Sequence, residues 1–137
     1  MKKHNSIGVV VGRFQVASLH AGHKHLLRRA KKFNSHLFVV LGTPEFPTPR
    51  NPLSFEMRKR MIEKTFPGTI VASIADRRSD QEWTEALDAL IAERFPNAGV
   101  TLYGSRDSFL AIYRGTHRSE IVDELPGHSG TQERARV

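Results

Sequence analysis

The sequence predicts an α/β protein in which a single doubly wound, Rossmann-like parallel sheet of about five strands is flanked by helices. Short apolar runs alternate along the chain with longer amphipathic stretches, a pattern typical of buried parallel strands joined by crossover helices. Three of the runs end in glycine, at Gly12, Gly42 and Gly104. At 137 residues the chain is long enough for one core. We therefore expect residues 1–137 to form a single domain with right-handed βαβ connections.

The strands are expected at the apolar runs, where β-branched residues are frequent. The first run reads Ile-Gly-Val-Val-Val and is followed by Gly12. A run of this kind, with little polar alternation, indicates a strand that is covered on both faces. The five expected strands are residues 7–11, 35–42, 69–74, 100–104 and 119–125.

The helices are expected where apolar residues recur at helical spacing among charged ones. Ser54 is a suitable N-cap for the second helix, and Pro67-Gly68 should end it. Residues 43–52 contain four prolines, so this segment should be a loop at the carboxyl end of the second strand. The first expected helix starts at His20 to His23 and includes Leu26, Leu27 and Ala30. The other expected helices are residues 55–66, 83–95 and 105–113, with a last helix after residue 129.

The composition excludes several classes of protein. The chain has no cysteine, which rules out disulfides, thiolate metal sites and a cysteine nucleophile. The apolar run after the basic start has about five residues, shorter than the core of a signal peptide and far short of the ~20 needed to cross a bilayer. We therefore expect a soluble, cytoplasmic protein with no membrane partner.

The net charge of +7 is compatible with two kinds of partner. A basic surface is typical of nucleic-acid-binding proteins, but here the basic residues are distributed over separate segments without interleaved aromatic residues. A cleft that holds nucleotide phosphates also requires positive potential. We expect no specific nucleic-acid partner, although charge alone does not decide between the two.

The junction between the first strand and the first helix carries the residues best suited to polyphosphate. Arg13 adds a permanent cation just after the strand. His20 and His23 are three apart at the helix start, so that both can present donors on one side, and Gly22 allows a ligand to approach the backbone. In a doubly wound sheet this junction is where helix N-terminal amides meet the carboxyl edge of the strands.

These residues resemble the signature of the HxGH nucleotidyltransferases, and in particular the nicotinamide-nucleotide adenylyltransferases of archaeal and phage type. Residues 12–15 read Gly-Arg-Phe-Gln and residues 20–23 read His-Ala-Gly-His. Two further segments match in the family's order. Residues 50–62 resemble its basic-Asn-Pro segment and following helix, and residues 129–134 resemble its Ser-x-Thr-x-x-Arg motif.

The resemblance implies a reaction in which the 5′-phosphate of nicotinamide mononucleotide attacks the α-phosphate of ATP, giving NAD and pyrophosphate. The protein would align the phosphates and neutralise charge rather than supply a nucleophile. Mg²⁺ would be coordinated mostly by the substrate phosphates and water, with no dedicated protein ligands. The resemblance thus implies an ATP-binding transferase of nucleotidyl groups with a role in NAD biosynthesis.

The resemblance also implies roles for individual residues. Arg134 and Thr131 would hold the β- and γ-phosphates, and Trp83 would stack on the nicotinamide ring. Asp80 stands where the archaeal relatives have asparagine. The implied sets are His20, His23 and Arg134 for catalysis; Gly12, Arg13, Phe14, Gly22, Ser129 and Thr131 for ATP; and Arg50, Asn51, Asp80 and Trp83 for the mononucleotide.

Two alternatives remain open. A sister nucleotidyltransferase, such as phosphopantetheine adenylyltransferase or a cytidylyltransferase, usually reads Gly-Thr-Phe-Asp where this sequence has Gly-Arg-Phe-Gln. A non-catalytic nucleotide-sensing or nucleic-acid-binding module would keep the fold without the reaction. The sequence ends three residues after Arg134, so we expect the C-terminal helix of the relatives to be short or truncated here. Assembly into a homo-oligomer is left open.

Overall fold

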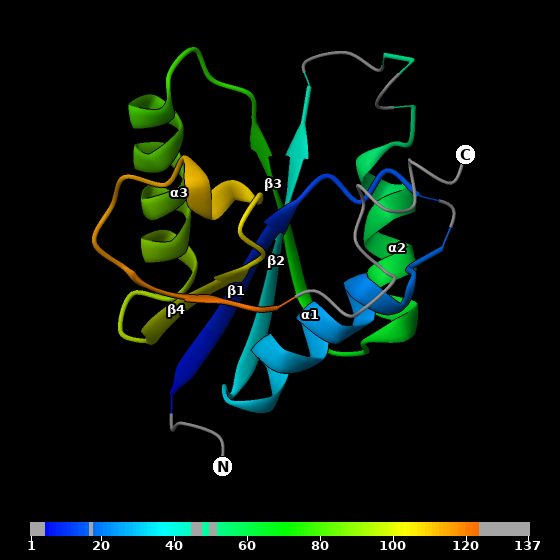
Figure 1. Cartoon of the computed structure of the whole chain (residues 1–137), viewed down its shortest axis with the longest axis horizontal. Coiled ribbons are helices and arrows are strands. Elements are labelled where there is room, and N and C mark those ends of the chain that lie inside the picture. Colours follow the sequence, from blue (N-terminus) through cyan, green and yellow to red (C-terminus); the bar gives the residue numbers. More distant parts are fainter. Residues whose placement is uncertain (1–4, 17, 45–47, 50–51, 124–137) are drawn as a thin grey trace.

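The computed structural model describes residues 5–16, 18–44, 48–49 and 52–123 and contains one sheet of five strands (Figure 1). The strand order is β3-β2-β1-β4-β5, and each neighbouring pair is parallel. The strands are β1 (Ser6–Gly12), β2 (His36–Thr43), β3 (Ile70–Ala75), β4 (Gly99–Gly104) and β5 (Arg118–Ile121). The predicted fold class is confirmed, including the short fifth strand, which forms an edge of the sheet.

The helices begin at side chains that cap them. They are α1 (Ala21–Lys32), α2 (Phe55–Thr65), α3 (Asp80–Arg94) and one 3₁₀ turn, η1 (Phe109–Ala111). Ser54 and Ser79 each accept a hydrogen bond from the backbone N–H three residues further on, at the starts of α2 and α3. Such caps satisfy donors that have no partner within the helix. Because Ser79 is the cap, α3 begins three residues earlier than the predicted start at Trp83.

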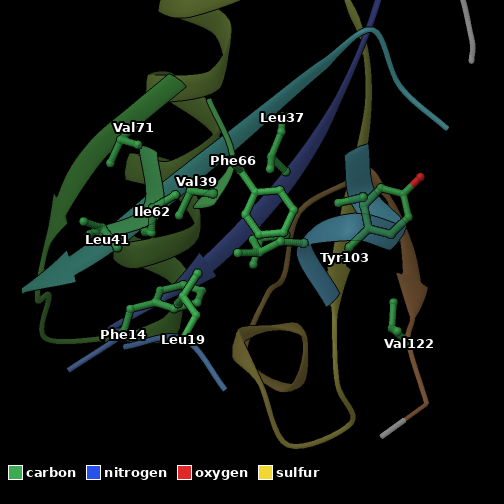
Figure 2. Close-up of a cluster of buried hydrophobic side chains, with 13 residues drawn as sticks. Phe14, Leu19, Leu37, Val39, Leu41, Ile62, Phe66, Val71, Tyr103 and Val122 are labelled. Carbon is green, nitrogen blue, oxygen red and sulfur yellow. The ribbon is translucent and has the colours of Figure 1, made fainter. Parts of the chain in front are cut away.

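Two hydrophobic cores lie on opposite faces of the sheet. Helices α1 and α2 cover one face, and α3 covers the other together with η1 (Figure 1). The alternation of a strand separates the two sets: Val10 belongs to the core under α1 and α2, whereas Val9 and Val11 belong to the core under α3. Figure 2 shows the first core, in which Ile62 and Phe66 lie near side chains of β2 and β3.

Helix α1 packs unusually close to β1 because Gly8 has no side chain. A Cβ at Gly8 would lie 2.5 Å from the carbonyl oxygen of Ala30 in α1. Strand β1 lies between β2 and β4, so the sheet order reverses beside it. The carboxyl edge of a doubly wound sheet at this reversal is the usual place for a ligand.

The predicted short helix at residues 105–113 is reduced to the single turn η1. The Ser108 hydroxyl donates to the Ser105 carbonyl and accepts from the Leu110 N–H, so side-chain hydrogen bonds replace part of the helical pattern. The predicted last helix lies outside the described residues. No helix in the described ranges has the length and apolar character needed to cross a membrane.

Candidate functional site

A pocket of about 750 Å³ opens at the carboxyl edge of the sheet, on the face covered by α3. It lies beyond the ends of β1 and β2, beside the start of α3 and next to η1. We call it the crevice pocket, and its lining consists of Val11, Gly12, Arg13, Gly42, residues 76–80, Trp83, residues 107–109 and Ile112. Its volume is within the range of small-molecule sites. Four of the candidate residues lie in this lining: Gly12, Arg13, Asp80 and Trp83.

Arg13 places a guanidinium at this pocket and is paired with a carboxylate there. Its Nη2 donates to Asp76 Oδ1 at 2.6 Å, and both side chains are about half exposed. The stem of Arg13 lies over Gly42, where an added Cβ would be 3.6 Å from Arg13 Cγ. An arginine in this position suits the recognition of phosphate, because its planar fork can form two parallel hydrogen bonds.

Trp83 and Asp80 occupy the first turn of α3, and both line the crevice pocket, as their three-residue spacing predicts. The indole is partly buried and packs against the core under α3, with its ring 6.1 Å from that of Phe109. Trp83 therefore serves packing and faces the pocket at once. Asp80 Oδ2 accepts a hydrogen bond from Arg114 Nη2 at 3.5 Å.

His20 and His23 form a reciprocal cap at the start of α1. The Nδ1 atom of His20 accepts from the backbone N–H of Gly22 at 3.0 Å and of His23 at 3.2 Å. The Nδ1 atom of His23 accepts from the N–H of His20 at 3.3 Å. The two rings are stacked, with centroids 3.6 Å apart. This is a capping box built from imidazoles in place of the usual hydroxyl and carboxylate.

The cap determines the tautomer of both imidazoles. A nitrogen that accepts a hydrogen bond carries no proton, so the neutral form of each ring has its proton on Nε2. Both histidines are partly buried, and neither belongs to the lining of the crevice pocket. The structure therefore brings the candidate residues together in two groups: a histidine pair at α1, and an arginine–tryptophan pocket at α3.

Phe14 lies between Arg13 and the histidine pair in the chain and is itself buried. Its φ of 49° is in the left-handed region, and its ring centroid is 5.2 Å from that of His23. A Cβ at Gly12 would lie 2.9 Å from the Phe14 ring, so glycine at this position leaves room for the phenyl group. Gln15 then binds the backbone of Leu53, donating to its carbonyl and accepting from its N–H. These contacts fix the turn that leads from β1 to α1.

Arg58 is a residue of this region to which the sequence reasoning gave no role at the site. It lies on α2 and is 1% exposed, yet each of its hydrogen bonds goes to a backbone carbonyl: Ser54, Arg13 and Gly42. Burial and the nearby charge of Arg13 lower the pKa of Arg58. The sequence does carry a signal, because Arg58 shares helical spacing with Phe55 and Ile62 and so faces the core.

Five of the candidate residues lie outside the described residues: Arg50, Asn51, Ser129, Thr131 and Arg134. Their roles stay predictions. Within the described ranges no group of three or more histidine and acidic side chains could hold a metal ion. The carboxylates of Asp76 and Asp80 do face the crevice pocket, a donor chemistry that suits Mg²⁺ when phosphate oxygens and water complete the shell.

The comparisons with known proteins agree with this architecture. Residues 9–113 match the cytidylyltransferase-like family model. The fold is similar to two structures of a bifunctional NMN adenylyltransferase/ADP ribose pyrophosphatase from Francisella tularensis, one complexed with AMP and a manganese ion (24% identity, TM-score 0.72) and the other described without them (24%, 0.74). It is also similar to the NadR protein in complex with NAD and AMP-PNP (18%, 0.67).

Each of these structural matches covers 97% of this chain but only 41% or 42% of the matched chain, so this chain spans about two fifths of the length of those proteins. A search of the curated proteins gave no match. The family model, in contrast, spans most of the chain and includes both groups of site residues at α1 and α3. The protein is therefore a member of the cytidylyltransferase-like family, within the HxGH nucleotidyltransferase superfamily.

Proposed function

We propose that this nucleotidyltransferase transfers the adenylyl group of ATP to nicotinamide mononucleotide, giving NAD and pyrophosphate. The observation that carries the proposal is the crevice pocket, where the Trp83 indole and the Arg13 guanidinium line the same cavity. An aromatic face suits a cationic pyridinium ring, an attraction of ~0.5–2 kcal/mol. The Arg13 guanidinium suits a nucleotide phosphate, the role near ATP that the family resemblance gives it, so the two substrates would meet in this cavity.

The reaction needs alignment more than activation. An oxygen of the mononucleotide 5′-phosphate attacks the α-phosphorus of ATP, a new P–O bond forms, and the bond to the bridging oxygen breaks so that pyrophosphate leaves with its electron pair. The attacking group is already an anion, so no residue has to remove a proton. The protein lowers the barrier by holding the two phosphates in line and by placing donors where charge develops.

Two groups of described residues carry such donors. The Nε2–H groups of His20 and His23 and the N-terminus of α1 would support ATP phosphates. Arg13, which follows β1 and lines the crevice pocket, would add a guanidinium. A phosphate that binds Arg13 would compete with the Asp76 carboxylate, which is paired with Arg13 in the structure.

Asp80 would contact the carboxamide of the mononucleotide. A carboxylate accepts hydrogen bonds from an amide NH₂ but repels the carboxylate of nicotinate mononucleotide. Arg114 Nη2 lies 3.5 Å from Asp80 Oδ2 and weakens this discrimination without removing it, since the pair is solvent-exposed. Mg²⁺, when bound, would neutralise phosphate charge on the side of Asp76 and Arg13.

A cytidylyltransferase is the second candidate, because the matching family model carries that description. CTP in place of ATP and an alcohol phosphate in place of the mononucleotide would fit the same chemistry at the α-phosphate. The pyridinium-stacking role of Trp83 separates the two, since an alcohol phosphate offers no ring to stack.

The test is the steady-state kinetics of Trp83→Ala and Trp83→Phe. We expect Trp83→Ala to raise the KM for nicotinamide mononucleotide about tenfold and to leave the KM for ATP within about twofold, since stacking of ~0.5–2 kcal/mol corresponds to a change in affinity of about 2- to 30-fold. Trp83→Phe retains an aromatic face, so its KM for nicotinamide mononucleotide should lie between those of the wild type and Trp83→Ala. If the substitutions lower the stability of the protein and change the KM values for both substrates equally, the proposed role of Trp83 is wrong.

A further inference from the structure

Arg58 combines features that packing alone does not explain. It is the largest side chain in the described part of the chain that is fully buried, and it lies on α2, on the opposite face of the sheet from the crevice pocket. Among the described residues no carboxylate pairs with it, and each of its partners is a backbone carbonyl. Burying a cation without a counter-ion is costly, so a charge kept here calls for a reason.

The partners of Arg58 supply that reason. Its Nη1 donates to the carbonyl of Arg13 at 2.8 Å and to that of Gly42 at 2.9 Å. Arg13 and Gly42 stand at the carboxyl ends of neighbouring strands, β1 and β2, and both line the crevice pocket. One guanidinium nitrogen therefore ties together the two strand ends from beneath the pocket floor.

The tie has two consequences for an anion in the pocket. Both carbonyl oxygens accept from the α2 side, so their negative ends are neutralised by a cation. The Arg13 backbone is also held while its stem rests on Gly42 and its head reaches Asp76, so the direction of its guanidinium is set before a ligand arrives. Preorganised charge of this kind is worth more than charge that must first be ordered.

We propose that Arg58 is a positioning residue for the phosphate site, which holds the Arg13 and Gly42 carbonyls and adds a buried positive charge behind the pocket. This inference rests on the proposed function for its substrates, but it predicts anion binding that does not depend on turnover. The same anchoring explains why the turn can carry Phe14 at a φ of 49°, since the residue before Phe14 is fixed by Arg58.

The experiment compares Arg58→Met, Arg58→Lys and a matched control, Arg60→Met, which removes the same charge from an exposed position on the same helix. Calorimetry measures the Kd for ATP and for inorganic pyrophosphate, and steady-state kinetics measures KM and kcat. We expect Arg58→Met to weaken binding of both anions about tenfold or more, the loss typical of a charged hydrogen bond. Arg58→Lys, which keeps the charge but loses the fork, should recover part of this affinity, and Arg60→Met should match the wild type.

Thermal unfolding of each variant separates positioning from stability. If Arg58→Met unfolds at a lower temperature but binds both anions with wild-type affinity while folded, Arg58 is structural and the inference is wrong. If Arg58→Met does not fold, Arg58→Lys decides: it keeps the charge but cannot reproduce the guanidinium geometry that holds the Arg13 and Gly42 carbonyls, so wild-type anion affinity in that variant would contradict the positioning role. Failure of the wild type to adenylate any acceptor would refute the proposed function and leave this comparison of anion affinities intact.

Discussion

At the scale of single residues, the two histidines of the HxGH motif have a structural duty that constrains their chemistry. Their Nδ1 atoms cap α1, so the Nε2 atoms are the donors available for phosphate in the neutral rings. A substitution at either position can therefore remove a cap, a donor or both. Variants that separate these two functions are needed to assign a role in catalysis.

His23→Ala and His23→Asn make that separation. Both lack the Nε2 donor, and we expect kcat to fall ~10²–10³-fold in each, the usual loss for one donor to a developing charge. The side-chain oxygen of asparagine can still accept from the His20 N–H, so only the alanine variant should lose about 1 kcal/mol of stability. Turnover numbers and urea unfolding measure the two effects. A folded His23→Asn enzyme that keeps more than a tenth of the wild-type rate would show that the motif is structural.

Asp80 and Arg114 make a second prediction at this scale. We expect the wild type to prefer nicotinamide mononucleotide over the nicotinate form, because Asp80 repels the acid. Asp80→Asn should narrow the ratio of kcat/KM values, and Arg114→Met should widen it about fivefold, since a partly screened charge at 4 Å is worth about 1 kcal/mol. Steady-state kinetics on both mononucleotides measures this ratio. If the ratio of kcat/KM values for the two mononucleotides is unchanged in both variants, Asp80 has no role in substrate recognition.

At the scale of elements, Tyr113 is one of the residues that attach the segment between η1 and β5 to α3, together with Arg114, whose backbone N–H donates to Thr84 Oγ1. The Tyr113 hydroxyl donates to Asp88 Oδ1 at 2.8 Å and accepts from the backbone N–H of His117 at 3.2 Å. Burial, opposed by the bond from His117 and reinforced by Asp88, raises the pKa of Tyr113 to about 12. Ile112 precedes Tyr113 in the chain and lines the crevice pocket, so the hydrogen bonds of Tyr113 also hold one wall of the site in place.

The raised pKa gives a prediction with a definite sign. A group whose pKa is higher in the folded state stabilises the protein below its unfolded pKa, near 10 for tyrosine, and that contribution is lost as the pH rises through the folded value. Tyr113→Phe should therefore cost about 1 kcal/mol at neutral pH, and the difference should shrink between pH 10 and about 12. Urea unfolding of both proteins across this range measures it. A difference that stays constant up to pH 12 would contradict the assigned cause.

At the scale of the whole molecule, the sequence was sufficient to predict the parallel sheet but not the side-chain contacts of the candidate site. Strand positions and parallel order follow from β-branched runs alternating with amphipathic helices, and the crossover rules leave few other arrangements. The same rules place residues 12–23 and the start of α3 at one edge. The pairing of Arg13 with Asp76 and the burial of Arg58 depend on side-chain packing between distant segments, which periodicity does not encode.

The lengths of two helical segments also could not be predicted from the sequence. The predicted helix at residues 105–113 became one 3₁₀ turn because the Ser108 hydroxyl competes for backbone groups, donating to the Ser105 carbonyl and accepting from the Leu110 N–H. The helix α3 gained a turn because Ser79 caps it. Both differences lie around the crevice pocket, because Ser79 and Ser108 belong to its lining.

Product analysis tests the central claim most directly. Purified protein is incubated with Mg²⁺ and either ATP or CTP, together with one acceptor from a panel of nicotinamide mononucleotide, nicotinate mononucleotide, phosphopantetheine and glycerol phosphate. Chromatography and phosphorus NMR then identify the nucleotide products and pyrophosphate. We predict NAD and pyrophosphate in equal amounts from ATP and nicotinamide mononucleotide, faster than product from any other pair. Preferred use of CTP or of an acceptor without a pyridine ring, or the absence of product from every pair, would contradict the account.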